Sequence, residues 1–313
     1  MLQDVLEGLA MPQKELSPKY LYDEHGSELF ERITELDAYY PTRKERGLLE
    51  AWAEAWVHEL RPRALVELGA GSAEKSRIVL SAMERAGTGD LYVPVDVSGV
   101  FLHDTARRLR TEYDDLRVEP EVADISLPFD LPRNLPVPAW VALLGSTIGN
   151  FGEDAARRLL GRVSGPMRGD DRFLMGVDLR PGAGKTVERL ELAYNDPEGI
   201  TAAFNLNVLR ILNRELDANF DLTAFEHRAF YSEEHRRIEM HLRARSRQTV
   251  RFGAAGAPVS IEEGESIRTE ISCKHDRESV DALFADAGLE VDRWAEDGQG
   301  FFALVLGKRT TPP

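Results

Sequence analysis

The chain is poor in several features that would place it in other classes of protein. It has one cysteine, Cys273, among 313 residues, so no internal disulfide can form and a reducing, cytoplasmic location is expected. No apolar run approaches the roughly 18 residues of a membrane span, and the N-terminal MLQDVLEGLAMPQKEL lacks the basic-then-apolar order of a signal peptide. Basic residues are outnumbered, and the net charge of −15 argues against nucleic acid and anionic membranes as partners. A small-molecule substrate is therefore favoured.

The histidines are also uninformative as metal ligands. The 7 histidines show no H-x-x-x-H pattern and no mixed Cys/His spacing, so no metal site is predicted. Internal repeats and low-complexity segments are missing too, and nothing in the sequence indicates an obligate protein partner. With 42% hydrophobic residues the chain can bury one large core or two smaller ones.

The most informative segment that is present is ALVELGAGSAEK, residues 64–75. An apolar run ends in Glu67 and breaks into a turn in which Gly69 and Gly71 remove Cβ atoms, as expected where a buried strand leads into a helix and a ligand approaches the backbone. Glu67 is suited to a cationic part of a ligand. A G-x-G alone is weak evidence, and a glycine-rich turn without a ligand stays open on these residues.

Further strands and helices alternate along the chain. A second strand ends in Asp96, about where an acidic residue reaching a ribose hydroxyl is expected, roughly 20 residues after a glycine turn. A third ends near Asp124, suited to an adenine amino group. This alternation predicts a doubly wound α/β sheet with ligands at the carboxyl ends of its strands. The predicted strands are 91–97, 116–125, 138–146 and 172–180, and the helices between them are 99–113 and 153–167.

The C-terminal part distinguishes between two uses of such a sheet. A helical pattern over 276–288 precedes strands over 289–294 and 301–306, whose short connection predicts an antiparallel hairpin. This arrangement resembles the class I S-adenosylmethionine-dependent methyltransferases, whose first motif, E/D-x-G-x-G, reads here as ELGAG over 67–71. The resemblance implies S-adenosylmethionine as cofactor rather than a nicotinamide dinucleotide.

Two regions lie outside the α/β pattern and predict a second, α+β domain. The first holds an amphipathic helix over 27–36 and a capping box of Thr42 and Glu45 that starts a helix ending near residue 60. The second holds helices over 186–195 and 198–220 and strands over 225–231, 236–246 and 266–274. The expected domains are therefore 44–184 with 274–313, and 1–43 with 185–273.

A more specific resemblance is carried by motifs that run in order from about residue 18 to residue 274. They are YD at 22–23, GSELFERITEL, YYPTR, VELGAGSAEKS, VPVDVS, LGSTIGNF, GVDLRPG, AYNDPEGITAAFNLNVL, IEMHL and RTEISCK. The chain is similar to the histidine-specific methyltransferases of ergothioneine biosynthesis. That family trimethylates the α-amino group of L-histidine to hercynine, and its substrate domain is built from an N-terminal segment and an insertion.

The resemblance also implies the residues of the site. On the cofactor side these are Gly69, Lys75, Asp96, Asp124 and Ile125, although the family often has a larger aromatic residue at position 125. The strand end and glycine turn described above add Glu67 and Gly71. On the histidine side they are Tyr39, Gly145, Asn150, Tyr194, Met240, Glu270 and Ser272, with Tyr22 and Phe30 as lid residues.

The residue types suit methyl transfer to an amine. Asn150 can accept from the amine and donate to the substrate carboxylate, and Tyr39 can hold the amine and help remove its proton, so these two are the predicted catalytic residues. Glu270 and Ser272 are two apart on a predicted strand, which gives them one face for the two imidazole nitrogens. Met240 is predicted to line the pocket.

Structural interpretations stay open for these residues. Tyr39 can be a buried aromatic, Asn150 a helix N-cap, Met240 core, and Glu270 with Ser272 a polar sheet face. Glu67 and Lys75 likewise fit as a strand-end acid and a solvated helix lysine. The alternatives in function are an N-methyltransferase for tryptophan or another aromatic amino acid, and a noncatalytic S-adenosylmethionine-binding module. An indole would leave a buried Glu270 unpaired, at a cost of several kcal/mol.

Overall fold

The computed structural model describes residues 1–253 and 255–310, and the chain divides into two compact units. Unit 1 consists of Met1–Tyr40 and Thr186–Ser272, and unit 2 of Pro41–Lys185 and Cys273–Pro313. Each unit has its own sheet and its own buried apolar residues, so each is described by itself.

The sheet of unit 2 is mostly parallel. Its order is β13-β14-β7-β6-β2-β3-β4, with β5 also paired to β3. Strand β14 pairs antiparallel with both β7 and β13, while β6, β2 and β3 pair in parallel. The predicted doubly wound sheet with a terminal antiparallel hairpin is confirmed. The strands are β2 (Ala64–Leu68), β3 (Leu91–Asp96), β4 (Arg117–Val118), β5 (Glu121–Val122), β6 (Ala139–Leu143), β7 (Arg172–Asp178), β13 (Leu289–Glu296) and β14 (Phe302–Arg309).

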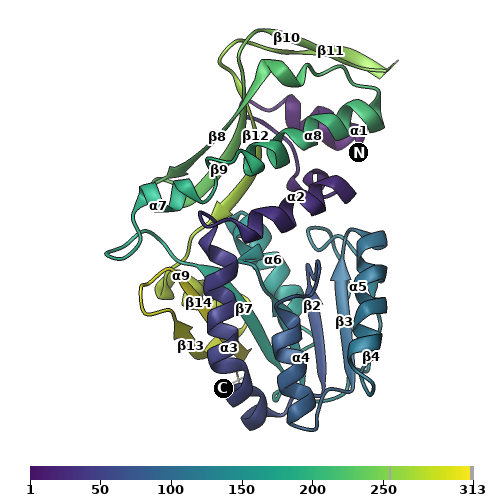
Figure 1. The fold of residues 1–313 in the computed structure, drawn as a ribbon, viewed down its shortest axis with the longest axis vertical. Helices are drawn as coiled ribbons and strands as arrows, with labels where there is room; N and C mark the ends of the chain where they lie inside the picture. The colour runs from purple at the N-terminus through teal and green to yellow at the C-terminus, as the bar shows by residue number, and fades with distance from the viewer. Residues whose placement is uncertain (254, 311–313) are drawn as a thin grey trace. The chain divides into compact units, whose positions relative to one another are not determined.

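Helices cover this sheet because its central strands are apolar on both faces. All residues of β2 and β6 are buried, as expected for strands between two helical layers. Leu160 of α6 and Phe284 of α9 pack with Val66 and Leu143 in one core cluster, and Figure 1 shows α3, α4 and α5 in front of the strands. The helices are α3 (Tyr40–Leu60), α4 (Ser76–Arg85), α5 (Gly99–Glu112), α6 (Glu153–Ser164) and α9 (Arg277–Asp286), with a 3-10 turn η2 (Thr147–Asn150).

Two local predictions in unit 2 are wrong. The strand expected over 116–125 is divided into β4 and β5, because Pro120 lies between them and has no amide for the ladder. The capping box of Thr42 and Glu45 does not form, because α3 already begins at Tyr40 and Thr42 lies within its first turn. The side chain of Glu45 is bonded to other elements of unit 2.

A buried cluster of charged side chains lies at the carboxyl end of β7. The Lys185 ammonium donates to Asp178 Oδ1 at 2.5 Å, and the Lys274 ammonium lies 2.7 Å from Oδ2. All three residues are at most 1% exposed. Since the chain leaves unit 2 after Lys185 and re-enters it at Cys273, one carboxylate holds both segments of chain.

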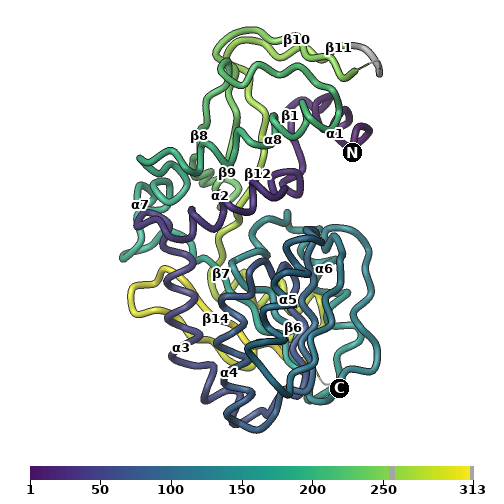
Figure 2. Tube along the Cα trace, turned by 45° about the vertical axis from the view of Figure 1, so that its right-hand side comes forward, coloured from purple at the N-terminus to yellow at the C-terminus, as the bar shows by residue number. Residues whose placement is uncertain are grey.

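Unit 1 contains a sheet in the order β1-β12-β9-β8 and a separate hairpin, β10-β11. Strands β8 and β9 are antiparallel, and β1 pairs parallel with β12. The strands are β1 (Lys14–Glu15), β8 (Phe225–Ser232), β9 (Arg237–Ala244), β10 (Gln248–Phe252), β11 (Ala255–Ile261) and β12 (Ser266–Cys273). The β10-β11 hairpin, which projects from the sheet in both views, was not predicted (Figures 1 and 2).

The helices of unit 1 pack through an apolar stripe on α8. Phe204, Val208 and Leu212 of this helix are all buried and form part of the core. Helix α2 begins at Glu24 because the carboxylate of Asp23 accepts from the amide of Gly26. The helices are α1 (Leu2–Leu9), α2 (Glu24–Glu35), α7 (Val187–Leu192) and α8 (Ile200–Leu216), with 3-10 turns η1 (Pro18–Leu21) and η3 (Leu222–Ala224).

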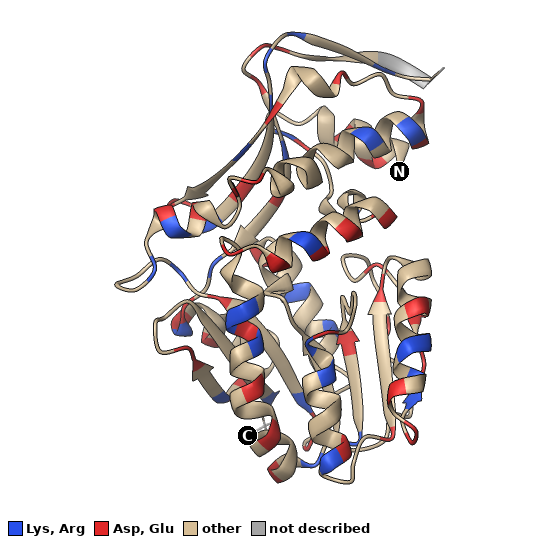
Figure 3. Cartoon of the chain, in the orientation of Figure 1, with Lys and Arg blue, Asp and Glu red and all other residues tan. Residues whose placement is uncertain are grey.

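Charged residues lie along the helices of unit 2. Figure 3 shows both acidic and basic positions on α3, α4 and α5. Over the described parts of the chain, no helix has the length and apolar character needed to cross a membrane.

Candidate functional site

The glycine turn of unit 2 has the backbone that the sequence requires. Gly69 and Gly71 have φ values of +75° and +51°, which favour glycine. The amides of Gly69 and Ala70 both donate to the carbonyl of Val95, at 2.8 and 3.1 Å, so the turn is fixed to the end of β3. A Cβ built at Gly71 would meet no atom of the described residues within 4 Å. The turn therefore leaves open space at the carboxyl ends of β2 and β3.

Two predicted carboxylates border this turn. Asp96 accepts from the amide of Gly71 and from that of Ser98, each at 3.0 Å, and so joins the glycine turn to the start of α5. Asp124, which follows β5, accepts from the amide of Ser126 at 2.9 Å. Ile125 is partly buried against the core of the sheet. The structure thus brings the Gly69–Gly71 turn and Asp96 together at the carboxyl ends of β2 and β3. Each of the two carboxylates, Asp96 and Asp124, orders the loop around it.

Glu67 is buried within the sheet. It is 3% exposed and accepts a hydrogen bond from the Tyr92 hydroxyl on the neighbouring strand. Burial raises the pKa of Glu67 to about 7. Its contact with a cofactor stays a prediction, and the structure gives it a bond within the sheet.

Glu45 of α3, which sequence reasoning missed, organises the loop that follows the carboxyl end of β6. The ammonium of Lys75 donates to Glu45 Oε2 at 2.6 Å, and the amide of Gly145 lies 2.8 Å from both carboxylate oxygens. Gly145 and Ser146 have φ values of +79° and +55°, which form a strained turn after β6. Asn150 ends η2 directly after this turn and is partly buried. The only sequence signal for Glu45 was an acidic residue after YYPTR, which was interpreted as part of a cap.

In unit 1 the predicted tyrosines belong to one aromatic cluster. Tyr39 meets Phe30 and Tyr194 edge to face, with ring centroids 6.4 and 6.1 Å apart. Tyr22 contacts Phe30 and Phe204 in the same way, at 5.7 and 5.3 Å. Edge-to-face pairs of this kind contribute about 0.5–1.5 kcal/mol each beyond their burial. The predicted lid residues and substrate tyrosines are therefore packed together.

Strands β9 and β12 carry the remaining predicted residues. The hydroxyls of Tyr194 and Ser272 are 3.0 Å apart, which links the aromatic cluster to β12. Met240 of β9 is 2% exposed, and Glu270 is partly buried. The alternating burial of β12 breaks at Glu270 and the residue after it, so the shared face expected for Glu270 and Ser272 stays a prediction.

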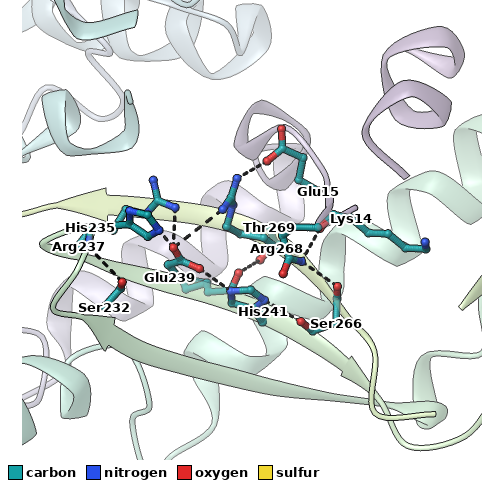
Figure 4. Close-up of polar contacts among 12 residues, drawn as sticks. Lys14, Glu15, Ser232, His235, Arg237, Glu239, His241, Ser266, Arg268 and Thr269 are labelled. Carbon is teal, nitrogen blue, oxygen red and sulfur yellow. Dashed lines mark hydrogen bonds and ion pairs between the residues drawn. The ribbon is translucent and has the colours of Figure 1, made fainter. Parts of the chain in front are cut away.

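A second polar cluster braces the same strands. Figure 4 shows Glu239 of β9 between Arg237, His241 and Arg268, and Arg268 also pairs with Glu15 of β1. Burial alone would raise the pKa of Glu239, but the contacts with His241 and Arg237 hold it below its usual range. The cluster joins β1, β12 and β9 and so fixes the strands on which Met240 and Glu270 lie.

The strand order of unit 2 and the glycine turn at its edge define a class I S-adenosylmethionine-dependent methyltransferase. A solved S-adenosylmethionine-dependent methyltransferase from Clostridium acetobutylicum has a similar fold, with a TM-score of 0.50 at 10% identity over 85% of this chain and 92% of that one. The family profile of histidine-specific, S-adenosylmethionine-dependent methyltransferases matches residues 1–309, and the chain belongs to this family.

Named relatives agree with this assignment. The chain is 41% identical to a histidine N-alpha-methyltransferase of Mycobacterium tuberculosis over 308 residues, which cover 98% of this chain and 94% of the relative. It is 29% identical to ergothioneine biosynthesis protein 1 of Neurospora crassa over 95% of its own length, but spans only 33% of that protein. The predicted family and its cofactor are confirmed.

Proposed function

We propose that the chain transfers methyl groups from S-adenosylmethionine to the α-amino group of L-histidine, three in succession, and so forms hercynine in the first step of ergothioneine biosynthesis. The observation that carries this proposal is the convergence of Tyr39, Tyr194 and Ser272 in unit 1. The two tyrosines suit a zwitterionic amino acid, because the hydroxyl of Tyr194 can donate to its carboxylate and that of Tyr39 can accept from its amine, while Ser272 is left for the ring.

The residues of unit 2 fit the cofactor. The Gly69–Gly71 turn leaves space that a side chain would fill, and Asp96 and Asp124 provide carboxylates for ribose and adenine donors. When bound, S-adenosylmethionine supplies an electrophilic methyl group on a sulfonium sulfur. In this proposal Asp96 also keeps the glycine turn in shape, since it accepts from the amide of Gly71.

The chain's own part in the chemistry is to position a neutral amine. The amine lone pair forms the new N–C bond as the C–S bond breaks, and the nitrogen must lose a proton before each attack. Asn150 is assigned to the amine and the carboxylate, and Tyr39 to the amine and its leaving proton. Methyl transfer of this kind uses no covalent enzyme intermediate.

Recognition of the imidazole ring of histidine is assigned to residues of unit 1. Glu270 and Ser272 are proposed to engage the two imidazole nitrogens, with Met240 as an apolar wall. A site built to hydrogen-bond a ring discriminates strongly, because a ring without matching groups leaves the carboxylate unpaired.

The direct test is steady-state methylation of L-histidine by the purified chain, beside Tyr39→Phe and Asn150→Ala. Both variants should bind the cofactor as the unmutated chain does and lose at least about tenfold in kcat/KM. If the unmutated chain binds S-adenosylmethionine and leaves histidine unchanged, the proposal is wrong. An unchanged kcat/KM in both variants would remove the roles given to these residues.

A further inference from the structure

We infer that Glu45 is a positioning residue that couples the cofactor side of the site to the histidine side. This inference rests on the proposed function, because it uses the roles that the family resemblance implies for Lys75 on the cofactor side and for Gly145 on the histidine side. Its basis is a single carboxylate that binds both residues at once.

The geometry at Glu45 leaves little freedom. Oε2 receives the Lys75 ammonium at 2.6 Å, and both oxygens lie 2.8 Å from the Gly145 amide. Glu45 is 0% exposed, whereas the Lys75 side chain is 20% exposed. The carboxylate is thus enclosed by protein, whereas the lysine side chain stays partly accessible to solvent. Charge-assisted bonds of this kind are short and directional.

Two glycines leave room for the Glu45–Lys75 ion pair. A Cβ built on Gly176 of β7 would lie 1.8 Å from Glu45 Oε1, far inside any contact distance. A Cβ on Gly145 would lie 3.0 Å from the Lys75 ammonium. Gly176 is not explained by its strand alone, since it lies within β7. The central strands therefore accommodate a charged side chain that the sheet itself does not need.

The Gly145 turn depends on the same carboxylate. Ser146 holds a left-handed backbone at φ +55°, which costs a residue with a side chain about 1–3 kcal/mol. The Ser146 hydroxyl accepts from the amide of Asp178 at 2.9 Å, and Glu45 holds the amide of Gly145. Loss of Glu45 should therefore relax the turn that leads into Asn150 and, at the same time, free the Lys75 ammonium.

The test compares Glu45→Gln with Lys75→Met, their double variant, and Glu50→Gln as a control. Glu50 is an exposed acid on the same helix. Glutamine keeps the size of the side chain but removes the charge that holds Lys75, and it leaves the Gly145 amide one neutral oxygen in place of two charged ones. Calorimetric titration with S-adenosylhomocysteine gives the cofactor affinity, and steady-state kinetics give KM for each substrate.

Glu45→Gln should raise the Kd for S-adenosylhomocysteine and the KM for histidine, each by about tenfold or more. Lys75→Met should raise the Kd for the cofactor product and change the KM for histidine by less than about threefold. The double variant should bind the cofactor product no more weakly than the weaker single variant, because both changes break the same bond. Glu50→Gln should match the unmutated chain.

The inference would be overturned if the losses of cofactor affinity in Glu45→Gln and Lys75→Met were fully additive in the double variant. It would also be overturned if a folded Glu45→Gln protein changed only the Kd for S-adenosylhomocysteine or only the KM for histidine. If Glu45→Gln does not fold, Lys75→Arg and Lys75→Met decide the matter. Arginine should keep the affinity within about threefold and methionine should lose it, and equal affinities would contradict the role of the ion pair. Cofactor affinity is measured without turnover, so failure of histidine methylation in the unmutated chain counts against the proposed function alone.

Discussion

The substitution Asp178→Asn should be the most damaging single change in unit 2 that leaves shape nearly unaltered. The Asp178 carboxylate is the shared partner of the Lys185 and Lys274 ammonium groups, and all three residues are at most 1% exposed. Removing one partner of a buried ion pair costs about 3–5 kcal/mol, because a buried charge is left uncompensated. Here two ammonium groups lose their anion, so we expect a loss at the upper end of that range.

The loss should depend on pH in a defined direction. Burial lowers the pKa of Lys185 to about 8, so between this value and the ordinary pKa of lysine the unfolded chain binds more protons and stability rises with pH. Without Asp178 the pKa of Lys185 should fall further. In the variant this lysine can therefore lose its charge at lower pH. The difference in the free energy of unfolding between the variant and the unmutated chain should narrow between pH 7 and pH 9.

Tryptophan fluorescence gives a suitable assay for this prediction. The 4 tryptophans, residues 52, 56, 140 and 294, all belong to unit 2, so their emission during urea unfolding follows that unit. Asp286→Asn is the matched control, because it breaks the exposed pair with Arg157 and should cost about 0–1 kcal/mol. A cost for Asp178→Asn no larger than that of the control would refute the reasoning.

Three further predictions follow from the site. Asp96→Ala should weaken S-adenosylmethionine binding by about 1–3 kcal/mol in calorimetry, because the Gly71 amide and the ribose lose their acceptor, and unchanged affinity would contradict this. Glu270→Ala should lower kcat/KM for histidine by about 1–3 kcal/mol, and adding Met240→Val should shift preference toward tryptophan; a constant histidine-to-tryptophan ratio would count against both assignments. Glu67 has a folded pKa of about 7, above its unfolded value, so its contribution to stability is full below pH 4.5 and falls by about 3 kcal/mol as pH rises through 7. Glu67→Gln should remove that fall from urea unfolding curves, and an identical pH profile would show that Glu67 is not the cause.

Much of unit 2 could be predicted because its signals are local. Apolar runs, the Gly69–Gly71 turn and the short connection before β14 each report on backbone that lies next to them in sequence. The division of the third strand at Pro120 was not predicted but could have been, since a residue without an amide hydrogen stands in the middle of the run.

The contacts around Glu45 and Asp178 could not be predicted in the same way. Glu45 meets Gly145 100 positions later in the chain, and Asp178 meets Lys274 only after the whole second segment of unit 1. Their partners depend on which helix and which strand end come together, which no local pattern encodes. For Glu45 the local pattern even favoured a different structure, a capping box, because a threonine lies three residues before it.

Mass spectrometry of the reaction products tests the proposed function most directly. The purified chain is incubated with S-adenosylmethionine and a panel of free amino acids at mildly alkaline pH, where the α-amino group is deprotonated. We predict that histidine acquires three methyl groups on its α-nitrogen and that tryptophan, phenylalanine and tyrosine stay unmodified. Methylation of another amino acid in preference to histidine, or of the imidazole ring instead of the α-nitrogen, would contradict the central claim.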